Sequence, residues 1–75
     1  MFYNLNMKNK FAERLREVRI QNKLGQVQLA ELCNVQQSCV SKWERGITLP
    51  DAEMLYTICE VLHESADFLL GLKDY

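Results

Sequence analysis

The sequence predicts an all-α domain built from five short helices around one hydrophobic core. Apolar residues recur at steps of three and four along most of the chain, which is the periodicity of a helix with one buried face. Gly, Asn, Pro and Asp residues separate these segments, and no segment shows the alternation expected of a strand. The chain has 75 residues and an apolar content of 48%, which suits a single folded domain and argues against disorder.

The first two helices are separated by a short connector. The first is expected over residues 9–22, and its apolar positions are spaced for one buried face: Phe11, Leu15 and Val18. The connector Leu24-Gly25 follows, and Gly25 is an acceptable N-cap. The second helix is therefore predicted over residues 26–33.

The third helix follows the second after a tight turn, and residues 26–45 together form a two-helix motif. Asn34 directly follows the second helix, and Asn tolerates the left-handed backbone that such a turn requires. Ala30 is small enough to stand where the two helices touch. The third helix is expected over residues 36–45 and should end at Gly46. Its inner contacts are predicted to come from Val35, Val40 and Trp43, which leaves an outward polar set: Gln36, Gln37, Ser38, Ser41 and Lys42.

Two further helices complete the predicted fold. Asp51 is a favoured N-cap and precedes a helix expected over residues 52–62. Ser65 similarly precedes a short helix expected over residues 66–70. The longer of the two has one apolar face made by Leu55, Ile58, Cys59 and Leu62.

The charge is distributed unevenly, although the net charge is only −1. Residues 8–23 hold six basic and two acidic side chains, residues 24–48 are balanced, and residues 49–75 hold six acidic side chains and one basic. A phosphate backbone responds to the local field of the surface that faces it. The alternative is that these charges simply solvate helix faces.

The cysteines do not predict a disulfide framework or a metal centre. There are three of them, an odd number, which fits a reducing compartment. Cys33, Cys39, Cys59 and His63 could nominally form a four-ligand zinc set, but no tight C-x-x-C pair is present. We expect core packing for the thiols and a helix-ending surface position for His63.

Several functional classes have no support in the sequence. No apolar run approaches the roughly 18 residues of a membrane span, and residues 1–10 lack the apolar stretch of a signal peptide. We therefore expect a cytoplasmic protein. No phosphate-binding glycine loop, H-E-x-x-H motif or nucleophile–histidine arrangement is present, so neither an enzyme nor a bound cofactor is predicted.

The chain resembles the Cro/C1-type (XRE-like) helix-turn-helix family of phage and bacterial regulators over about residues 11–71. The resemblance rests on the residues Leu15, Arg19, Leu24, Gln26, Leu29-Ala30, Val35, Val40-Ser41-Lys42-Trp43-Glu44-Arg45-Gly46, Pro50, Leu55, Ile58, Leu62 and Asp67-Phe68-Leu69-Leu70-Gly71. It implies a compact lambda-repressor-like DNA-binding domain, with residues 1–10 as an N-terminal arm and residues 72–75 as a C-terminal tail. The chain departs from the family where Gly25 and Gln36 replace the usual Ser or Thr caps and Asn34 replaces the usual turn glycine.

The resemblance also implies roles for individual residues. It places base reading on the third helix, at Gln37, Ser38 and Lys42, with Gln36 and Ser41 at the edge of that surface. It places phosphate contacts at Gln26, Arg45 and Thr48. In relatives the counterparts of Arg19 and Glu44 form a partly buried ion pair, and Arg19 is also a candidate phosphate contact. For each polar side chain on the outer face, plain solvation is the competing interpretation.

The sequence therefore predicts a sequence-specific regulator of transcription, with repression the favoured role, that binds a double-stranded DNA operator through residues 36–45. A homodimer is expected. The favoured interface holds Leu70, Leu72 and Tyr75, and the second candidate is the arm with Phe2, Tyr3 and Leu5, where Leu5 and Met7 alternate as in a short strand. The alternative function is an antitoxin-like or adaptor module whose partner is another protein. An antirepressor is a further candidate protein partner.

Overall fold

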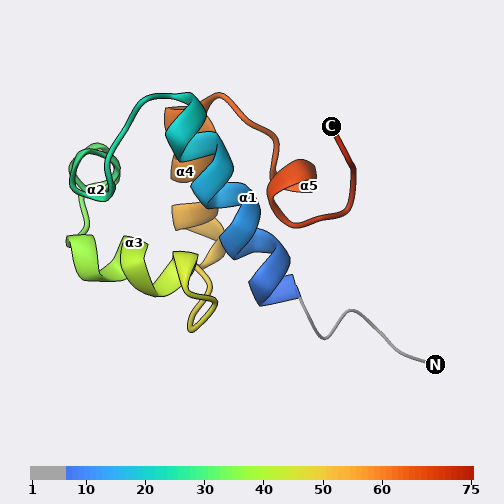
Figure 1. The fold of residues 1–75 in the computed structure, drawn as a ribbon, viewed down its shortest axis with the longest axis horizontal. Coiled ribbons are helices and arrows are strands. Elements are labelled where there is room, and N and C mark those ends of the chain that lie inside the picture. Colours follow the sequence, from blue (N-terminus) through green and yellow to red (C-terminus); the bar gives the residue numbers. More distant parts are fainter. Residues whose placement is uncertain (1–6) are drawn as a thin grey trace.

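The computed structural model describes residues 7–75, and within this range the secondary structure is five α-helices without a strand (Figure 1). The predicted all-α, five-helix fold is therefore confirmed. The helices are α1 (Met7–Gln21), α2 (Gln26–Cys33), α3 (Gln37–Glu44), α4 (Ala52–Leu62) and α5 (Ala66–Leu69).

Three helices have bounds that differ from the prediction. Helix α1 begins at Met7, two residues early, and ends at Gln21, one residue early. The strand-like pattern suggested for Leu5 and Met7 is wrong at Met7, because residues 7–10 are helical. Helix α3 is one residue shorter at each end, because Gln36 is its extended N-cap and Arg45 its C-cap. Helix α5 ends at Leu69, one residue early. The other arm residues proposed for dimerisation lie outside the described range.

The core forms between helices that are neighbours in sequence and helices that are distant in sequence. Helix α1 packs against α3 and α5, whereas α2 packs against α3 and α4. Ala30 is 2% exposed, which fits its predicted place at the contact of the two motif helices. The central cluster consists of Phe11, Leu15, Val18, Leu29, Ala30, Cys33, Val40, Trp43, Ile58, Leu62 and Leu69. One face of α3 is thus fixed from behind by the rest of the domain.

Left-handed residues make the turns that orient α3. Asn34 has φ 59° and closes α2, and the amide of the following Val35 donates to the carbonyl of Ala30 at 2.9 Å. Gly46 has φ 73° beyond the end of α3, where an added Cβ would lie 2.8 Å from Oδ1 of Asn9. Both positions were predicted from residue type, and the close approach at Gly46 gives a second reason for glycine.

Polar side chains cap the last two helices as predicted. Oδ1 of Asp51 accepts a hydrogen bond from the amide of Met54 at 2.8 Å, and Oγ of Ser65 accepts one from the amide of Phe68 at 3.1 Å. His63 follows α4 as an exposed left-handed C-cap. His63 and Ser65 lie in the short connection between α4 and α5, and α5 packs against α1.

Candidate nucleic-acid interface

Helix α3 separates its side chains into a buried face and an exposed face. Val40 is fully buried and Trp43 is 5% exposed. Four of the five residues predicted to point outward are exposed: Gln36, Gln37, Ser38 and Lys42. Ser41 is the exception, because it is half-buried and its Oγ accepts a hydrogen bond from Nε of Arg45 at 3.2 Å. The candidate reading surface therefore consists of Gln36, Gln37 and Ser38 at the start of α3 and Lys42 in its last turn.

A buried ion pair joins α1 to the end of α3. Nε of Arg19 lies 2.6 Å from Oε2 of Glu44, and Nη2 lies 2.9 Å from Oε1. Nη1 also donates to the carbonyl of Leu24 at 2.9 Å. Only 11% of the Arg19 side chain and 3% of the Glu44 side chain are exposed. This bidentate geometry fixes the orientation of α3 relative to α1.

The same contacts leave Arg19 poorly placed for a second role at a phosphate. Each nitrogen of its guanidinium already donates within the domain, and the residue as a whole is 9% exposed. The hydrogen bond to Glu44 raises the pKa of Arg19 above its ordinary value, although desolvation acts in the opposite direction. The geometry therefore favours the structural role over direct contact with DNA.

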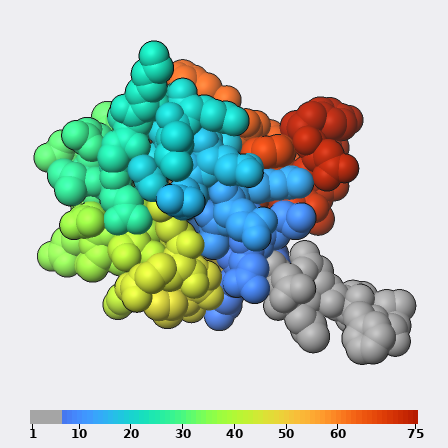
Figure 2. Space-filling model, in the orientation of Figure 1, coloured from blue at the N-terminus to red at the C-terminus, as the bar shows by residue number. Residues whose placement is uncertain are grey.

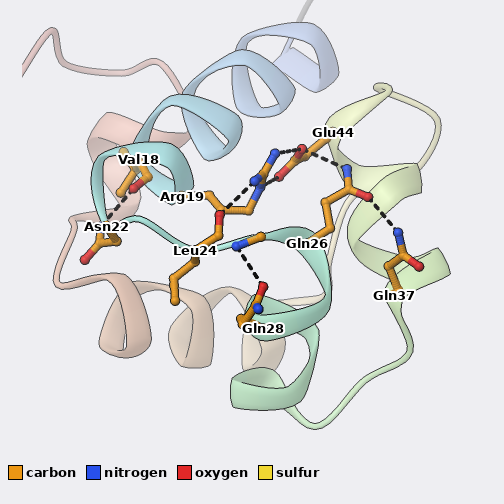
Figure 3. A network of polar contacts seen from close by, with 9 residues as sticks. Val18, Arg19, Asn22, Leu24, Gln26, Gln28, Gln37 and Glu44 are labelled. Atoms are coloured by element: carbon orange, nitrogen blue, oxygen red, sulfur yellow. Dashed lines mark hydrogen bonds and ion pairs between the residues drawn. The ribbon is translucent and has the colours of Figure 1, made fainter.

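Gln26 connects this ion pair to the exposed face of α3. Its Nε2 donates to Oε1 of Glu44 at 3.0 Å, and its Oε1 accepts from Nε2 of Gln37 at 3.1 Å (Figure 3). The sequence identified Gln26 and Gln37 separately, as a phosphate contact and a base reader. It gave no indication that one amide holds the other, because they are eleven positions apart and meet only in the folded motif.

The start of α2 is capped by a residue that the sequence reading missed. Oε1 of Gln28 accepts a hydrogen bond from the amide of Gly25 at 2.9 Å. A Gln three positions after the N-cap is half of a capping box, so the signal was present in the sequence. Gln36, in contrast, caps α3 without any side-chain hydrogen bond.

The remaining phosphate candidates lie at the C-terminal end of α3. Arg45 and Thr48 are both exposed, and the segment that carries them (yellow) lies on the surface beside α3 (Figure 2). Arg45 also borders an open groove of about 450 Å³ between α1 and the end of α3. Its lining residues are Asn9, Ala12, Glu13, Arg16, Glu17, Ile20, Glu44 and Arg45.

Arg14, one of the six basic residues in the segment 8–23, contacts the C-terminal tail. Arg14 donates through Nη1 to the carbonyls of Phe68, at 2.8 Å, and Lys73. Its Nη2 lies 3.3 Å from Oδ1 of Asp74, and its guanidinium lies 4.4 Å from the centroid of the Phe68 ring. Arg14 therefore anchors the C-terminal tail to α1, a role that the sequence reading did not identify.

The cysteines sit in or beside the core. Cys33 is buried, whereas Cys39 and Cys59 are half-buried and pack against the central cluster. Burial raises the pKa of the Cys33 and Cys59 thiols, and nearby Glu64 and Glu60 add to the effect at Cys59. Within residues 7–75, no three His, Cys, Asp or Glu side chains gather as a metal site would require.

The helices of the described range are too short or too polar for any of them to cross a membrane.

Comparison with known sequences identifies the family. A helix-turn-helix family matches residues 15–69, which include all of the two-helix motif. The chain belongs to this Cro/C1-type helix-turn-helix family. It is a family of DNA-binding transcription regulators and not a class of enzymes.

Two curated relatives have opposite regulatory roles. The chain is 38% identical over 61 residues to the HTH-type transcriptional activator BcrR of Enterococcus faecalis, covering 81% of this chain and 30% of BcrR. It is 36% identical over 58 residues to Repressor protein C2 of Salmonella phage P22, covering 77% of this chain and 27% of C2. The chain thus spans less than a third of either relative.

The fold is shared with a solved regulator. The crystal structure of the clp gene regulator ClgR from Corynebacterium glutamicum superposes with a TM-score of 0.80 at 26% sequence identity. The match covers 87% of this chain and 69% of that one. A second crystal structure of ClgR gives a TM-score of 0.77, with 84% of its chain covered.

Proposed function

We propose that this chain binds double-stranded DNA in a sequence-specific way and regulates transcription, with α3 inserted in the major groove. The observation that carries the proposal is the division of α3 into a fixed inner face and an exposed face with Gln37, Ser38 and Lys42. Gln can pair with adenine through one donor and one acceptor, and Lys favours the acceptors of guanine. A rigid helix that presents such side chains is suited to reading base edges.

Contacts to the phosphate backbone would set the position of α3 in the groove. Gln26 lies at the start of α2, where free backbone amides favour an anion. Arg45 and Thr48 are exposed beyond the other end of α3. These residues flank the base-reading surface on both sides, as positioning contacts should. The overall charge of −1 does not oppose binding, because phosphates respond to the nearby surface.

Binding-site selection from random duplexes tests base reading. We expect Gln37→Ala to weaken binding to the selected site by about 1–3 kcal/mol and to relax preference at one base pair. Gln21→Ala, an exposed Gln at the end of α1, is the matched control and should select the same site as the unmodified chain. Unchanged preference in the Gln37 variant would remove this residue from the reading surface.

The alternative is a module that binds protein, supported by the acidic segment at residues 49–75. A salt titration of binding to random duplex DNA separates the two functions. A nucleic-acid interface loses affinity steeply as salt rises, because bound phosphates release counterions. Absence of measurable duplex binding at low salt would favour the protein-binding alternative.

We propose repression as the regulatory role. A small domain that covers an operator can block polymerase without making any further contact. A promoter fused to the selected site and to a reporter gene tests this idea. If the chain is a repressor, reporter output should be lower when the chain is present. Higher output would indicate a transcriptional activator, as BcrR is named.

We further propose a homodimer formed through the C-terminal tail, placing two copies of α3 about 34 Å apart, one turn of DNA. Leu72 and Tyr75 are 72% and 83% exposed, and Leu70 is half-buried beside them in sequence. The tail lies at the opposite end of the molecule from α3 (Figure 1), so pairing there would leave α3 free. Sedimentation of a Leu72→Ser, Tyr75→Ser variant should show a monomer. If that variant stays dimeric and deletion of residues 1–6 gives a monomer, the arm is the interface.

A further inference from the structure

Four side chains form a continuous line of hydrogen bonds from the interior of the domain to the exposed face of α3. The line runs from Arg19 to Glu44, then to Gln26, and ends at Gln37 (Figure 3). The first pair is nearly buried, with Glu44 the less exposed at 3%, and the last residue is exposed. The line therefore connects a buried charge to an exposed amide on the surface of α3.

The chemistry of the carboxylate gives this line a direction. An ionised carboxylate can only accept hydrogen bonds. Gln26 must therefore turn its NH₂ group toward Glu44, which leaves its carbonyl oxygen facing Gln37. That oxygen also only accepts, so Gln37 must turn its own NH₂ group toward Gln26. The orientation of both amides follows from the charge of Glu44.

The consequence is that Gln37 has a defined set of free hydrogen-bonding groups. One N–H of its amide is used by Gln26, so one N–H donor and the carbonyl oxygen remain. In the major groove adenine presents one acceptor, N7, and one donor group, N6. Guanine presents two acceptors, and a Gln with one free N–H can satisfy only one of them.

We propose that the Arg19–Glu44 ion pair sets the donor–acceptor orientation of Gln37 through Gln26, which makes Glu44 a remote determinant of base preference. The inference rests on the proposed function and adds to it the role of Glu44, a positioning residue that acts on Gln37 through Gln26. The NH₂ group of Gln26 has a second N–H beyond the one donated to Glu44, and this N–H can serve a DNA phosphate.

The first test measures preference separately from affinity. Affinities are determined for two duplexes that differ only in carrying adenine or guanine at the base pair that Gln37→Ala relaxes. We expect the unmodified chain to favour adenine by about tenfold or more. In Gln26→Met the ratio should fall to about threefold or less, whereas loss of a phosphate contact would weaken both duplexes equally. Gln28→Met is the matched control, because this Gln lies on α2 outside the line.

The second test acts on the charge itself. Glu44→Gln keeps the size of the side chain but allows a donor to face Gln26, so both downstream amides can reverse and Gln37 can offer two N–H groups. The adenine-to-guanine ratio should therefore shift toward guanine. Adding Glu44→Gln to Gln26→Met should cause no further change in the ratio, because the line is already broken. Thermal melts identify any variant that is unfolded at the assay temperature.

Failure of the proposal is distinguishable from failure of the proposed function. If no duplex is preferred by the unmodified chain, sequence-specific binding itself is wrong. If Gln37→Ala relaxes one base pair but Gln26→Met and Glu44→Gln retain the full adenine preference, the function stands and the orienting line is wrong. Selection of guanine at that base pair by the unmodified chain would also overturn the assigned orientation.

Discussion

Two arginines on the same helix make ion pairs of very different kinds. Arg19 and Arg14 lie five positions apart on α1, and each reaches a distant part of the chain. The side chain of Glu44 is 3% exposed, and its carboxylate receives two hydrogen bonds from Arg19. The side chain of Asp74 is 97% exposed, and its Oδ1 lies 3.3 Å from Nη2 of Arg14.

The difference shows that the surroundings of the acidic partner determine what an ion pair contributes. A desolvated carboxylate depends on its partner, because the charge has no water to replace a lost hydrogen bond. An exposed carboxylate is already solvated, so its ion pair adds little. Arg14 instead gains from the neutral groups around it, namely two backbone carbonyls and the ring of Phe68.

The largest expected effect is at Glu44. Glu44→Ala should lower the free energy of unfolding by about 3–5 kcal/mol, because it leaves the Arg19 guanidinium buried without a carboxylate. Urea unfolding followed by fluorescence can measure it, since Trp43 is the single tryptophan, is 5% exposed and precedes Glu44. Glu31→Ala, an exposed position on α2, is the control and should change stability by less than about 0.5 kcal/mol. Equal stabilities of the two variants would show that the buried Arg19–Glu44 ion pair does not stabilise the fold.

A smaller effect is expected at Arg14. Arg14→Met keeps an apolar stem against Phe68 but removes the guanidinium, with its carbonyl hydrogen bonds and its contact with the ring. We expect a loss of about 1–2 kcal/mol, which is the usual size of a hydrogen bond plus a cation–π contact.

Hydrogen exchange can place the Arg14 effect within the fold. Exchange should accelerate mainly at the amides of residues 69–73, which follow the anchored carbonyl of Phe68. Uniform acceleration over α3 as well would mean that Arg14 supports the whole core and not only the tail.

The sequence predicted the parts of the structure that depend on local patterns. Helix α2 and helix α4 have the predicted limits, because Gly25 and Asp51 stand at their N-caps and left-handed residues follow them. The start of α1 was placed too late, since residues 7–10 carry few apolar side chains to show the helical periodicity. Local pattern and capping residues thus predicted both ends of α2 and α4, and the ends of the other helices to within two residues.

The contacts that link distant residues were only partly predictable. Arg19 and Glu44 were paired by resemblance to a family, not by their spacing. The amide of Gln26 was assigned to DNA, but its hydrogen bonds to Glu44 and Gln37 depend on the angle between α2 and α3. The anchoring role of Arg14 joins positions more than fifty residues apart, and a charge count cannot distinguish it from a phosphate contact.

The smallest effect is expected at Asp74. A variant at this position tests whether the exposed Arg14–Asp74 ion pair contributes less to stability than the buried Arg19–Glu44 pair. Asp74→Asn removes the charge from the Arg14 ion pair but leaves both carbonyl hydrogen bonds and the Phe68 contact intact. Because this carboxylate is almost fully exposed, we expect the same thermal melting temperature as the unmodified chain, at low salt and at 1 M salt. The charge-neutralising variant of the buried pair, Glu44→Gln, should be less stable under both conditions, since burial shields that pair from added ions. A drop in melting temperature for Asp74→Asn that disappears at 1 M salt would show that the exposed carboxylate does stabilise the fold. The burial of the acidic residue would then not be sufficient to predict how strongly each of these two ion pairs stabilises the fold.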